Sequence, residues 1–366
     1  MEYWNYIDTI LEYATKQGFS DIHLKTDSYI KIRNKNWEID DLIEFETDWK
    51  IQKLEILSIE NIRGIIKTII WEDWYTQFKE TYELDTSYTT KGNSEKYRVN
   101  VYHDSEWYSI AFRTIPKIIP SLAELWLWDN IKELCHKSKW LVLVTGPTWS
   151  WKSTNLASMI DYINSNFKKH IITIEDPVEF VLKSKKSLVN QREVWHHTKW
   201  FDNAIKSLLR EDPDIIMIWE MRDLETIKAA ITLAETWHLV FSTLHTNDSV
   251  QSIDRIIDVF SSSQQKQIRM QLAMSLVWIV SQRLVSRSDK PWRVPAREVL
   301  ITNDAVRNLI ITGKAHHLYS VLEVWQKEWM ILMDKYLIAL YKKWIIDKDT
   351  LYSYIRDKDS AEMLLN

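Results

Sequence analysis

Apolar and polar positions alternate with a period of two over much of the first third of the chain. This alternation is typical of half-buried strands, and two stretches with apolar residues at helical spacing, residues 3–17 and 58–79, accompany it. The predicted strands of an antiparallel sheet lie at 84–88, 96–102 and 108–114. The pattern therefore predicts a compact α+β domain over residues 1–115.

Short, continuous apolar runs replace the alternation from about residue 140 onward. Such runs are typical of parallel strands that are buried on both faces, and helical stretches separate them here. The runs lie at 141–144, 171–174, 215–218 and 239–244. Strands and helices in alternation predict a parallel sheet with helices on both faces. We expect this α/β domain over residues 125–366, with a helical region from about 303 and a proline-bounded linker at 116–124.

A candidate phosphate-binding loop follows the first apolar run. Such loops read glycine, four residues, glycine, lysine, then serine or threonine, and Gly146, Lys152 and Ser153 fit this pattern. Trp151 stands at the second glycine position. Glycine lets backbone N–H groups pack around phosphates, whereas an indole at 149 or 151 would crowd them. The candidate nucleotide-binding residues are Gly146, Pro147, Thr148, Trp149, Ser150, Trp151, Lys152, Ser153 and Thr154.

Composition offers an explanation for this departure. The chain has 5 glycines and 20 tryptophans. Average usage of about 7% predicts roughly 26 glycines, close to the two types together. Tryptophans also stand where turns and helix ends favour glycine, as at Trp37 and Trp237. We hypothesise that the gene reads UGA as glycine, while Trp49 and Trp74, in aromatic contexts, are genuine. The alternative is a tryptophan-rich protein with a degenerate loop.

Charge and cysteine content narrow the classes of function. The net charge of −4 and the pI near 6.2 provide no global basic field, so we expect no nucleic-acid partner. A single cysteine, Cys135, excludes a disulfide framework and a cysteine-based zinc site. We find no apolar run of about 18–20 residues and no signal peptide. We therefore expect a cytoplasmic protein whose association with a membrane is peripheral.

Three polar residues follow predicted core strands and are candidates for catalysis. Glu175 ends the run at 171–174, and Glu220 follows the run at 215–218 with Trp219 between them. Ligands of open α/β sheets bind at the carboxyl ends of the strands, where an acid can hold Mg²⁺ or activate water. His245 follows the run at 239–244 and is a candidate γ-phosphate sensor.

Two arginines on predicted strands of the first domain are further candidates. Arg98 and Arg113 each have apolar neighbours. The simpler interpretation is a solvated strand face. The alternative is that these guanidinium groups neutralise phosphate charge on a nucleotide that is held elsewhere.

The ordered motifs resemble those of PilT-type retraction ATPases of the type IV pilus, within the secretion-ATPase superfamily. The resemblance runs over nearly the whole length. Residues 146–154 resemble the Walker A loop, 173–179 the Asp box, 215–223 the Walker B motif and 236–247 the His box. Ser20-Asp-Ile-His-Leu resembles the N-terminal signature. Tryptophan repeatedly occupies the family's glycine positions, which supports the recoding hypothesis independently of composition.

Weaker features favour the retraction class within this superfamily. Ala305-Val-Arg-Asn-Leu-Ile resembles the family's Ala-Ile-Arg-Asn-Leu-Ile motif, with a conservative difference at Val306 and with Ile311-Thr312 in place of Arg-Glu. We also expect neither the long N-terminal extension nor the four-cysteine zinc insertion of assembly ATPases.

The resemblance implies a homohexameric ring with a PAS-like N-terminal domain and a RecA-like P-loop NTPase core. It implies that Lys152 pairs with the β- and γ-phosphates of ATP, and that Ser153 and Glu220 hold Mg²⁺. Glu175 would polarise the attacking water, His245 would sense the γ-phosphate, and Arg98 and Arg113 would supply charge to the nucleotide. The ring would act on an inner-membrane pilus platform protein, at the inner face of the cytoplasmic membrane.

Three other functions remain open at this point. A pilus-assembly or type II secretion ATPase would share the fold. A catalytically dead ring subunit would result if Trp149 and Trp151 are real. A DNA-translocating motor is disfavoured by the acidic balance and by the lack of a basic stretch interleaved with aromatics. For the chain with tryptophan at these positions, we predict that the fold still forms. We also predict that the phosphate loop is distorted, or that its pocket is partly filled by indole.

Overall fold

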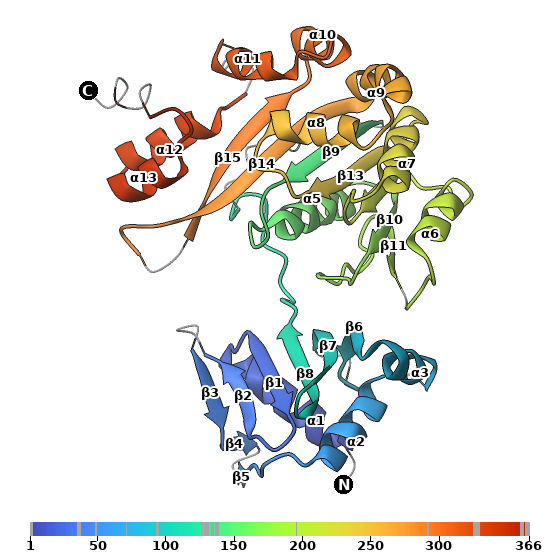
Figure 1. The fold of residues 1–366 in the computed structure, drawn as a ribbon, viewed down its shortest axis with the longest axis vertical. Coiled ribbons are helices and arrows are strands. Elements are labelled where there is room, and N and C mark those ends of the chain that lie inside the picture. Colours follow the sequence, from blue (N-terminus) through green and yellow to red (C-terminus); the bar gives the residue numbers. More distant parts are fainter. Residues whose placement is uncertain are drawn as a thin grey trace. The chain divides into compact units, whose positions relative to one another are not determined.

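The chain forms two compact units in a computed structural model (Figure 1). The first contains residues 1–118 and 177–181, and the second contains 119–176 and 182–366. Trp37 and Trp49 lie outside the part of the chain that the structure describes. The described residues are 3–34, 38–47, 50–70, 72–92, 95–125, 127, 132, 135, 139–194, 196–290, 293–324, 330–358 and 362.

The first unit contains a six-stranded sheet in the order β3-β2-β1-β8-β7-β6 and a separate hairpin of β4 and β5. Every pairing in the sheet is antiparallel. The strands are β1 (Asp21–Lys25), β2 (Ile30–Arg33), β3 (Ile39–Leu42), β4 (Glu44–Thr47), β5 (Lys50–Lys53), β6 (Glu83–Thr89), β7 (Lys96–Asp104) and β8 (Trp107–Thr114). The three strands expected from alternation are present.

Helix α1 (Tyr3–Gln17) and helix α2 (Ile59–Ile69) bury their apolar sides in the core of this unit. The helical stretch predicted at 58–79 divides into α2 and α3 (Glu72–Thr81). A capping box on Ser58 precedes helix α2, and the extended backbone of Ile70 ends it after Ile69. Trp74, a predicted genuine tryptophan, packs against the core.

The second unit is built on a seven-stranded sheet in the order β11-β10-β12-β13-β9-β14-β15. The strands are β9 (Trp140–Thr145), β10 (His170–Glu175), β11 (Leu188–Glu193), β12 (Ile215–Ile218), β13 (Leu239–Leu244), β14 (Leu276–Ser286) and β15 (Arg293–Ile301). All neighbours are parallel except β14 and β15. The predicted α/β class, a parallel sheet within a P-loop fold, is confirmed.

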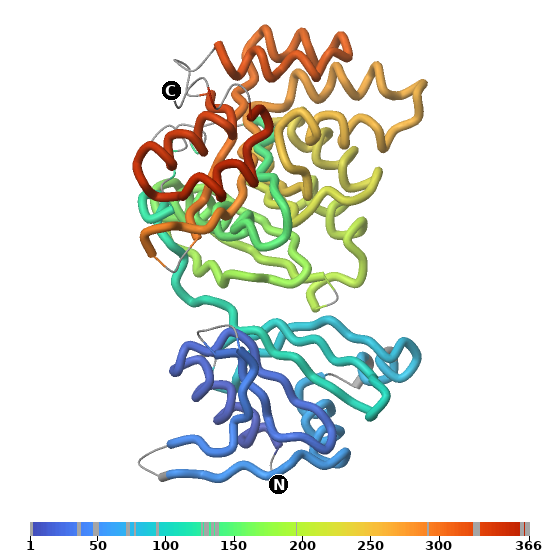
Figure 2. Tube along the Cα trace, turned by 60° about the vertical axis from the view of Figure 1, so that its left-hand side comes forward, coloured from blue at the N-terminus to red at the C-terminus, as the bar shows by residue number. Residues whose placement is uncertain are grey.

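Helices cover both faces of this sheet, as the tube in Figure 2 also shows. Along β12, Ile216 and Ile218 belong to one core, while Ile215 and Met217 belong to the other. Helix α5 (Lys152–Asn166) packs on one face. The other face carries α6 (Phe201–Leu208), α7 (Leu224–Glu235), α8 (Ser249–Asp258), α9 (Ser262–Ser275), α10 (Asp304–Ile311) and α11 (Leu318–Val324). Because both faces are buried there, the central strand β12 is apolar throughout.

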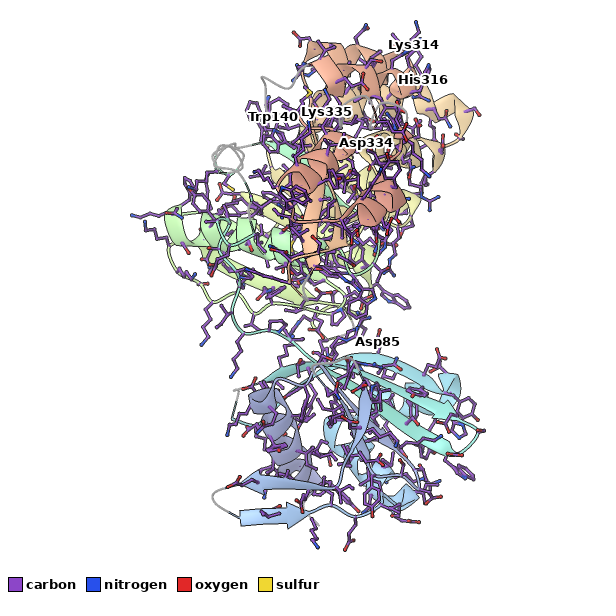
Figure 3. The ribbon with its side chains drawn as sticks, turned by 90° about the vertical axis from the view of Figure 1, so that its left-hand side faces the viewer. Asp85, Trp140, Lys314, His316, Asp334 and Lys335 are labelled. Atoms are coloured by element: carbon purple, nitrogen blue, oxygen red, sulfur yellow. The ribbon has the colours of Figure 1, made fainter. Side chains whose placement is uncertain are left out.

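A smaller apolar cluster joins the far ends of β14 and β15 to the last two helices. These are α12 (Met333–Lys342), whose start is labelled by Asp334 and Lys335 in Figure 3, and α13 (Lys348–Tyr354). Val285, Val294 and Leu337 are fully or almost fully buried in this cluster. Among the described residues, no helix is long and apolar enough to cross a membrane.

Tryptophan occupies left-handed backbone positions throughout the structure. Of the nine described non-glycine residues with positive φ, six are tryptophan: Trp107, Trp140, Trp149, Trp151, Trp237 and Trp344. This conformation is disfavoured for residues with a Cβ, and is uncommon for residues other than glycine, asparagine and aspartate. The distribution is therefore the one expected for glycine.

Two helix ends allow a direct comparison of tryptophan with glycine. After α10, Gly313 has φ 73° and donates to Ile310, and Lys314 donates to Leu309. After α12, Trp344 has φ 58° and donates to Tyr341, and the next residue donates to Leu340. Both ends have the two hydrogen bonds of a Schellman motif, whose left-handed residue is usually glycine. Trp344 therefore occupies a glycine position.

We expect Trp344→Gly to increase the free energy of unfolding by about 1 kcal/mol, because it relieves the left-handed strain of a residue with a Cβ. The side chain is 81% exposed, so few contacts are lost. Urea denaturation of the two chains checks this. Trp344→Ala is the matched control, since alanine keeps the Cβ and the strain. An equal gain for alanine and glycine would contradict the prediction.

Candidate nucleotide-binding site

The phosphate loop connects β9 to the N-terminus of α5, as the sequence predicts. Trp149 and Trp151 have φ of 68° and 63°, and Trp151 is the N-cap of α5 without a side-chain hydrogen bond to the helix. The first N–H groups of a helix have no partner within the helix, and they attract anions. The backbone therefore has the form of a phosphate-binding turn.

The expectation that indole would distort the loop is wrong for the backbone. Both tryptophans keep glycine-like dihedral angles, and the two residues are 56% and 43% exposed, so neither indole is buried in the protein interior. Trp149 nevertheless lines a hollow beside the loop. The backbone could take this shape because its hydrogen bonds and the residues packed against it outweigh the strain at two positions.

Gly146 is the position in the loop where space itself requires glycine. Its φ is 149°, and a Cβ there would lie 2.1 Å from the backbone oxygen of Gln282 and 2.6 Å from the Ser150 hydroxyl. Backbone atoms of β14 cannot move away cheaply, so a substitution at 146 would displace the loop from the sheet. The N–H of Gly146 also donates to the Leu244 carbonyl, 3.2 Å away.

Lys152 is buried and its ammonium group faces the start of the loop. Its Nζ donates to the carbonyl oxygens of Gly146 and Pro147 at 2.8 and 2.9 Å. These carbonyls accept hydrogen bonds from the buried ammonium group but do not neutralise its charge. The charge therefore favours an anionic ligand at the same place.

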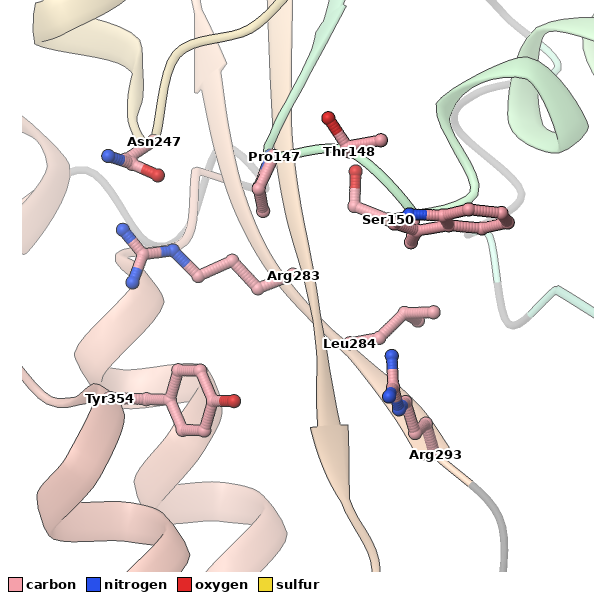
Figure 4. A pocket seen from close by; sticks show the side chains of 9 residues that line it. Pro147, Thr148, Ser150, Asn247, Arg283, Leu284, Arg293 and Tyr354 are labelled. Carbon is pink, nitrogen blue, oxygen red and sulfur yellow. The ribbon is translucent and has the colours of Figure 1, made fainter. Parts of the chain in front are cut away.

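A hollow of about 230 Å³ adjoins the loop (Figure 4). Its walls come from four parts of the second unit: the loop, the segment after β13, the β14–β15 hairpin and α13. The lining residues are Pro147, Thr148, Trp149, Ser150, Asn247, Arg283, Leu284, Arg293 and Tyr354. Two of them are arginines, and the buried Nε of Arg283 and Oγ of Ser150 have no hydrogen-bond partner among the described residues. The hollow therefore offers positive charge and unused polar groups.

Glu175 ends β10 with a buried side chain, 3% exposed. Its Oε1 accepts from the Thr173 hydroxyl at 2.6 Å and from Gln191 Nε2 at 2.9 Å. These bonds fix the direction of the carboxylate. A buried and oriented carboxylate at the carboxyl end of a strand suits a general base.

Glu220 and His245 lie together, as predicted from their places after β12 and β13. His245 Nε2 lies 3.4 Å from Glu220 Oε2, and Arg222 Nε donates to the same oxygen at 2.8 Å. The pKa of His245 is lowered, first by burial and next by the positive charge of Lys152, whereas Glu220 opposes the shift. His245 is therefore neutral near pH 7 and electrostatically coupled to the phosphate loop.

Arg98 and Arg113 lie opposite each other on β7 and β8 in the first unit. Like charges in this register repel unless carboxylates offset them. Asp85 accepts from Arg98 at 2.7 Å, and the buried Asp21 accepts from Arg113 Nε at 2.8 Å. The two arginines are therefore cross-strand neighbours on β7 and β8, and each forms an ion pair with a carboxylate.

Known proteins resemble this chain in sequence and in fold. The family model described as type II/IV secretion system protein matches residues 126–324. The twitching motility protein of Neisseria gonorrhoeae is 40% identical over 337 residues, which are 91% of this chain and 90% of that protein. The type IV pilus retraction ATPase PilT of Pseudomonas aeruginosa is 39% identical over 343 residues, 94% and 96% of the two chains.

A solved structure agrees over almost the full length. The crystal structure of the pilus retraction motor PilT with bound ADP superposes with a TM-score of 0.85, at 40% identity, and the match covers 98% of this chain and 99% of that one. The chain belongs to the type II/IV secretion system protein family. It is an ATPase of PilT type, and nucleotide binding is a property of this fold.

One part of the site of this secretion ATPase was not predicted from the sequence. Gln282 and Arg297 lie behind the phosphate loop, on β14 and β15, and neither side chain is exposed. The available signal was a polar run, Ser281-Gln282-Arg283, in the middle of an otherwise apolar strand. A buried strand has no reason to carry such residues unless their polar groups are paired.

The pKa of His245 provides a test of the predicted cluster. We expect Lys152→Met to raise this pKa, because a nearby positive charge is removed, and Glu220→Gln to lower it, because a negative charge is removed. NMR titration of ¹³C-labelled histidine in the secretion ATPase measures both shifts. Equal values in all three chains would show that His245 is not coupled to these groups.

Proposed function

We propose that this secretion ATPase hydrolyses ATP in a homohexameric ring to retract a type IV pilus. The observation that carries the proposal is the resemblance, at about 40% identity and over at least nine tenths of each chain, to proteins named for pilus retraction and twitching motility. The ring acts on a pilus platform protein of the inner membrane. It binds peripherally at the inner face of the cytoplasmic membrane and does not bind nucleic acid.

The proposal includes glycine at positions 149 and 151 of the natural protein. Both positions are left-handed, both belong to the phosphate loop, and the chain as a whole has too few glycines. Glycine leaves the observed backbone unchanged and removes two indoles from the approach to the loop. The retraction motor therefore has an ordinary phosphate loop in the cell.

ATP fits the polar groups of the loop. Lys152 Nζ is within reach of the loop carbonyls and pairs with the β- and γ-phosphates, while the N–H groups at the start of α5 contact the phosphates. When bound, Mg²⁺ neutralises phosphate charge, and it is usually held by one or two protein groups together with phosphate oxygens and waters. Ser153 and Glu220 are the proposed protein groups.

The remaining candidate residues each have one role in the proposed hydrolysis of ATP. Glu175, buried and held by Thr173 and Gln191, orients the attacking water and accepts its proton. His245 is neutral and contacts Glu220, so it can donate to the γ-phosphate without adding charge. Arg98 and Arg113 supply positive charge to the nucleotide, a contribution that reaches about 10³–10⁵ in rate where such arginines are known.

Peptide mass spectrometry of the protein from its native cells tests the glycine assignment. We expect glycine at the six left-handed positions 107, 140, 149, 151, 237 and 344. Trp74, which is partly buried against a core and does not have positive φ, serves as the internal control and should remain tryptophan. Tryptophan at 149 and 151 would favour the dead-subunit function instead.

We expect the double variant Trp149→Gly/Trp151→Gly to hydrolyse ATP. The chain with tryptophan at both positions should bind nucleotide at least about tenfold more weakly, since each indole crowds the phosphates. Trp149→Ala/Trp151→Ala is the control that removes the indoles but keeps the Cβ atoms. Adding Glu175→Gln should leave ATP binding in place and lower turnover by about 10²–10⁴. A coupled ADP-release assay and equilibrium binding measure the two effects.

A cellular assay connects the activity to pili. Expression of the glycine form in cells that lack their own retraction ATPase should restore pilus retraction, and the Glu175→Gln form should not. Longer or more numerous pili with the glycine form, without retraction, would support the assembly ATPase instead.

A further inference from the structure

The largest fully buried side chain in the described part of the protein is an arginine. Arg297 lies in β15 with no exposed surface. Its Nε donates to Gln282 Oε1 at 2.5 Å, and one terminal nitrogen donates to the Leu125 carbonyl at 2.6 Å. It also hydrogen-bonds the side chain of Tyr336 in α12. Two of these partners are uncharged, the Gln282 amide and the Leu125 carbonyl, and burial lowers the pKa of Arg297 to about 10.

Such an arrangement is costly, because the charge is removed from water. An apolar side chain of similar volume would serve packing equally well or better. The hydrogen bonds of the buried guanidinium therefore point to a role in holding other groups in place.

Gln282 is the group that Arg297 holds most directly. The two residues are opposite each other in the β14–β15 register. Gln282 Oε1 accepts from Arg297 and from Asn155 Nδ2 of α5 at 2.9 Å, so the amide nitrogen must point the other way. That nitrogen donates to the carbonyl oxygen of Ser150, inside the phosphate loop. Two donors on the oxygen exclude the flipped amide.

The same residue of β14 also contacts the other end of the loop. The backbone oxygen of Gln282 lies where a Cβ of residue 146 would be. Gln282 therefore meets the loop at Gly146 through its backbone and at Ser150 through its side chain. A single strand residue thus fixes the span of the loop between these two points.

We propose that Gln282 and Arg297 are positioning residues for the phosphate loop, and that through Tyr336 they couple the loop to helix α12. This inference rests on the proposed function, since it requires that the loop bind nucleotide. Phosphates in the loop take Lys152 away from the Gly146 and Pro147 carbonyls, and the resulting shift at the loop is passed through the Gln282 amide. Arg297 transmits it to α12.

The test uses the full chain with Trp149→Gly/Trp151→Gly as the parent, and ADP as the probe. Its first measurement is hydrogen–deuterium exchange of residues 333–342. ADP should slow exchange in the parent. In Tyr336→Phe, which removes one hydroxyl and leaves the loop intact, ADP should still bind while the change in α12 is lost. Tyr341→Phe removes the same group from the same helix and is the matched control; it should behave as the parent.

The second measurement is ADP affinity. Gln282→Met should raise the Kd about tenfold, because the Ser150 carbonyl and Arg297 each lose a buried hydrogen-bond partner. Parent-like affinity in Gln282→Met together with a parent-like exchange response in Tyr336→Phe would overturn the inference. If Gln282→Met fails to fold, the Tyr336→Phe exchange response alone decides the coupling. A parent that binds no ADP would instead refute the proposed function, so the two failures are distinguishable.

Discussion

Left-handed backbone in the phosphate loop is the constraint on which the rest of the site depends. N–H groups can converge on phosphates only if the chain turns through positive φ at 149 and 151 and approaches β14 closely at Gly146. Two indoles at these positions do not abolish the turn, because strand β9, helix α5 and the buried contacts of Ser150 hold both ends. The fold fixes the loop, and the side chains at its tip decide whether a ligand can enter.

Polar groups behind the loop supply part of that support. Lys152 is satisfied by loop carbonyls, Gln282 bonds to the Ser150 carbonyl, and Glu175 is held by two neighbours. Each of these groups would be costly to bury alone, and pairing makes each one rigid. The rigidity matters for chemistry, since a carboxylate or ammonium group acts on a reacting phosphate only from a fixed direction.

Much of this could be predicted from sequence, for identifiable reasons. Apolar runs such as 215–218 specify strands buried on both faces, and residues that follow such strands meet at one edge, which placed Glu220 beside His245. Other features could not be predicted. The break between α2 and α3 interrupts continuous helical spacing, and the pairing of Arg297 with Gln282 depends on the register of two strands far from the loop in sequence. The counts of tryptophan and glycine also do not say which tryptophans have left-handed backbone, so those dihedral angles had to come from the structure.

The same contacts limit where the loop can move when phosphates arrive. Lys152 must leave the carbonyls of Gly146 and Pro147, so the first half of the loop loses the bonds that close it. The second half cannot follow freely, because Ser150 stays bonded to Gln282, and Gln282 is held in turn by Asn155 and Arg297. The loop therefore opens first between residues 146 and 149, and the movement that reaches Ser150 pulls on Gln282. A glycine at 149 places a flexible joint at the end of that segment, which a tryptophan there, restricted to one strained conformation, cannot provide.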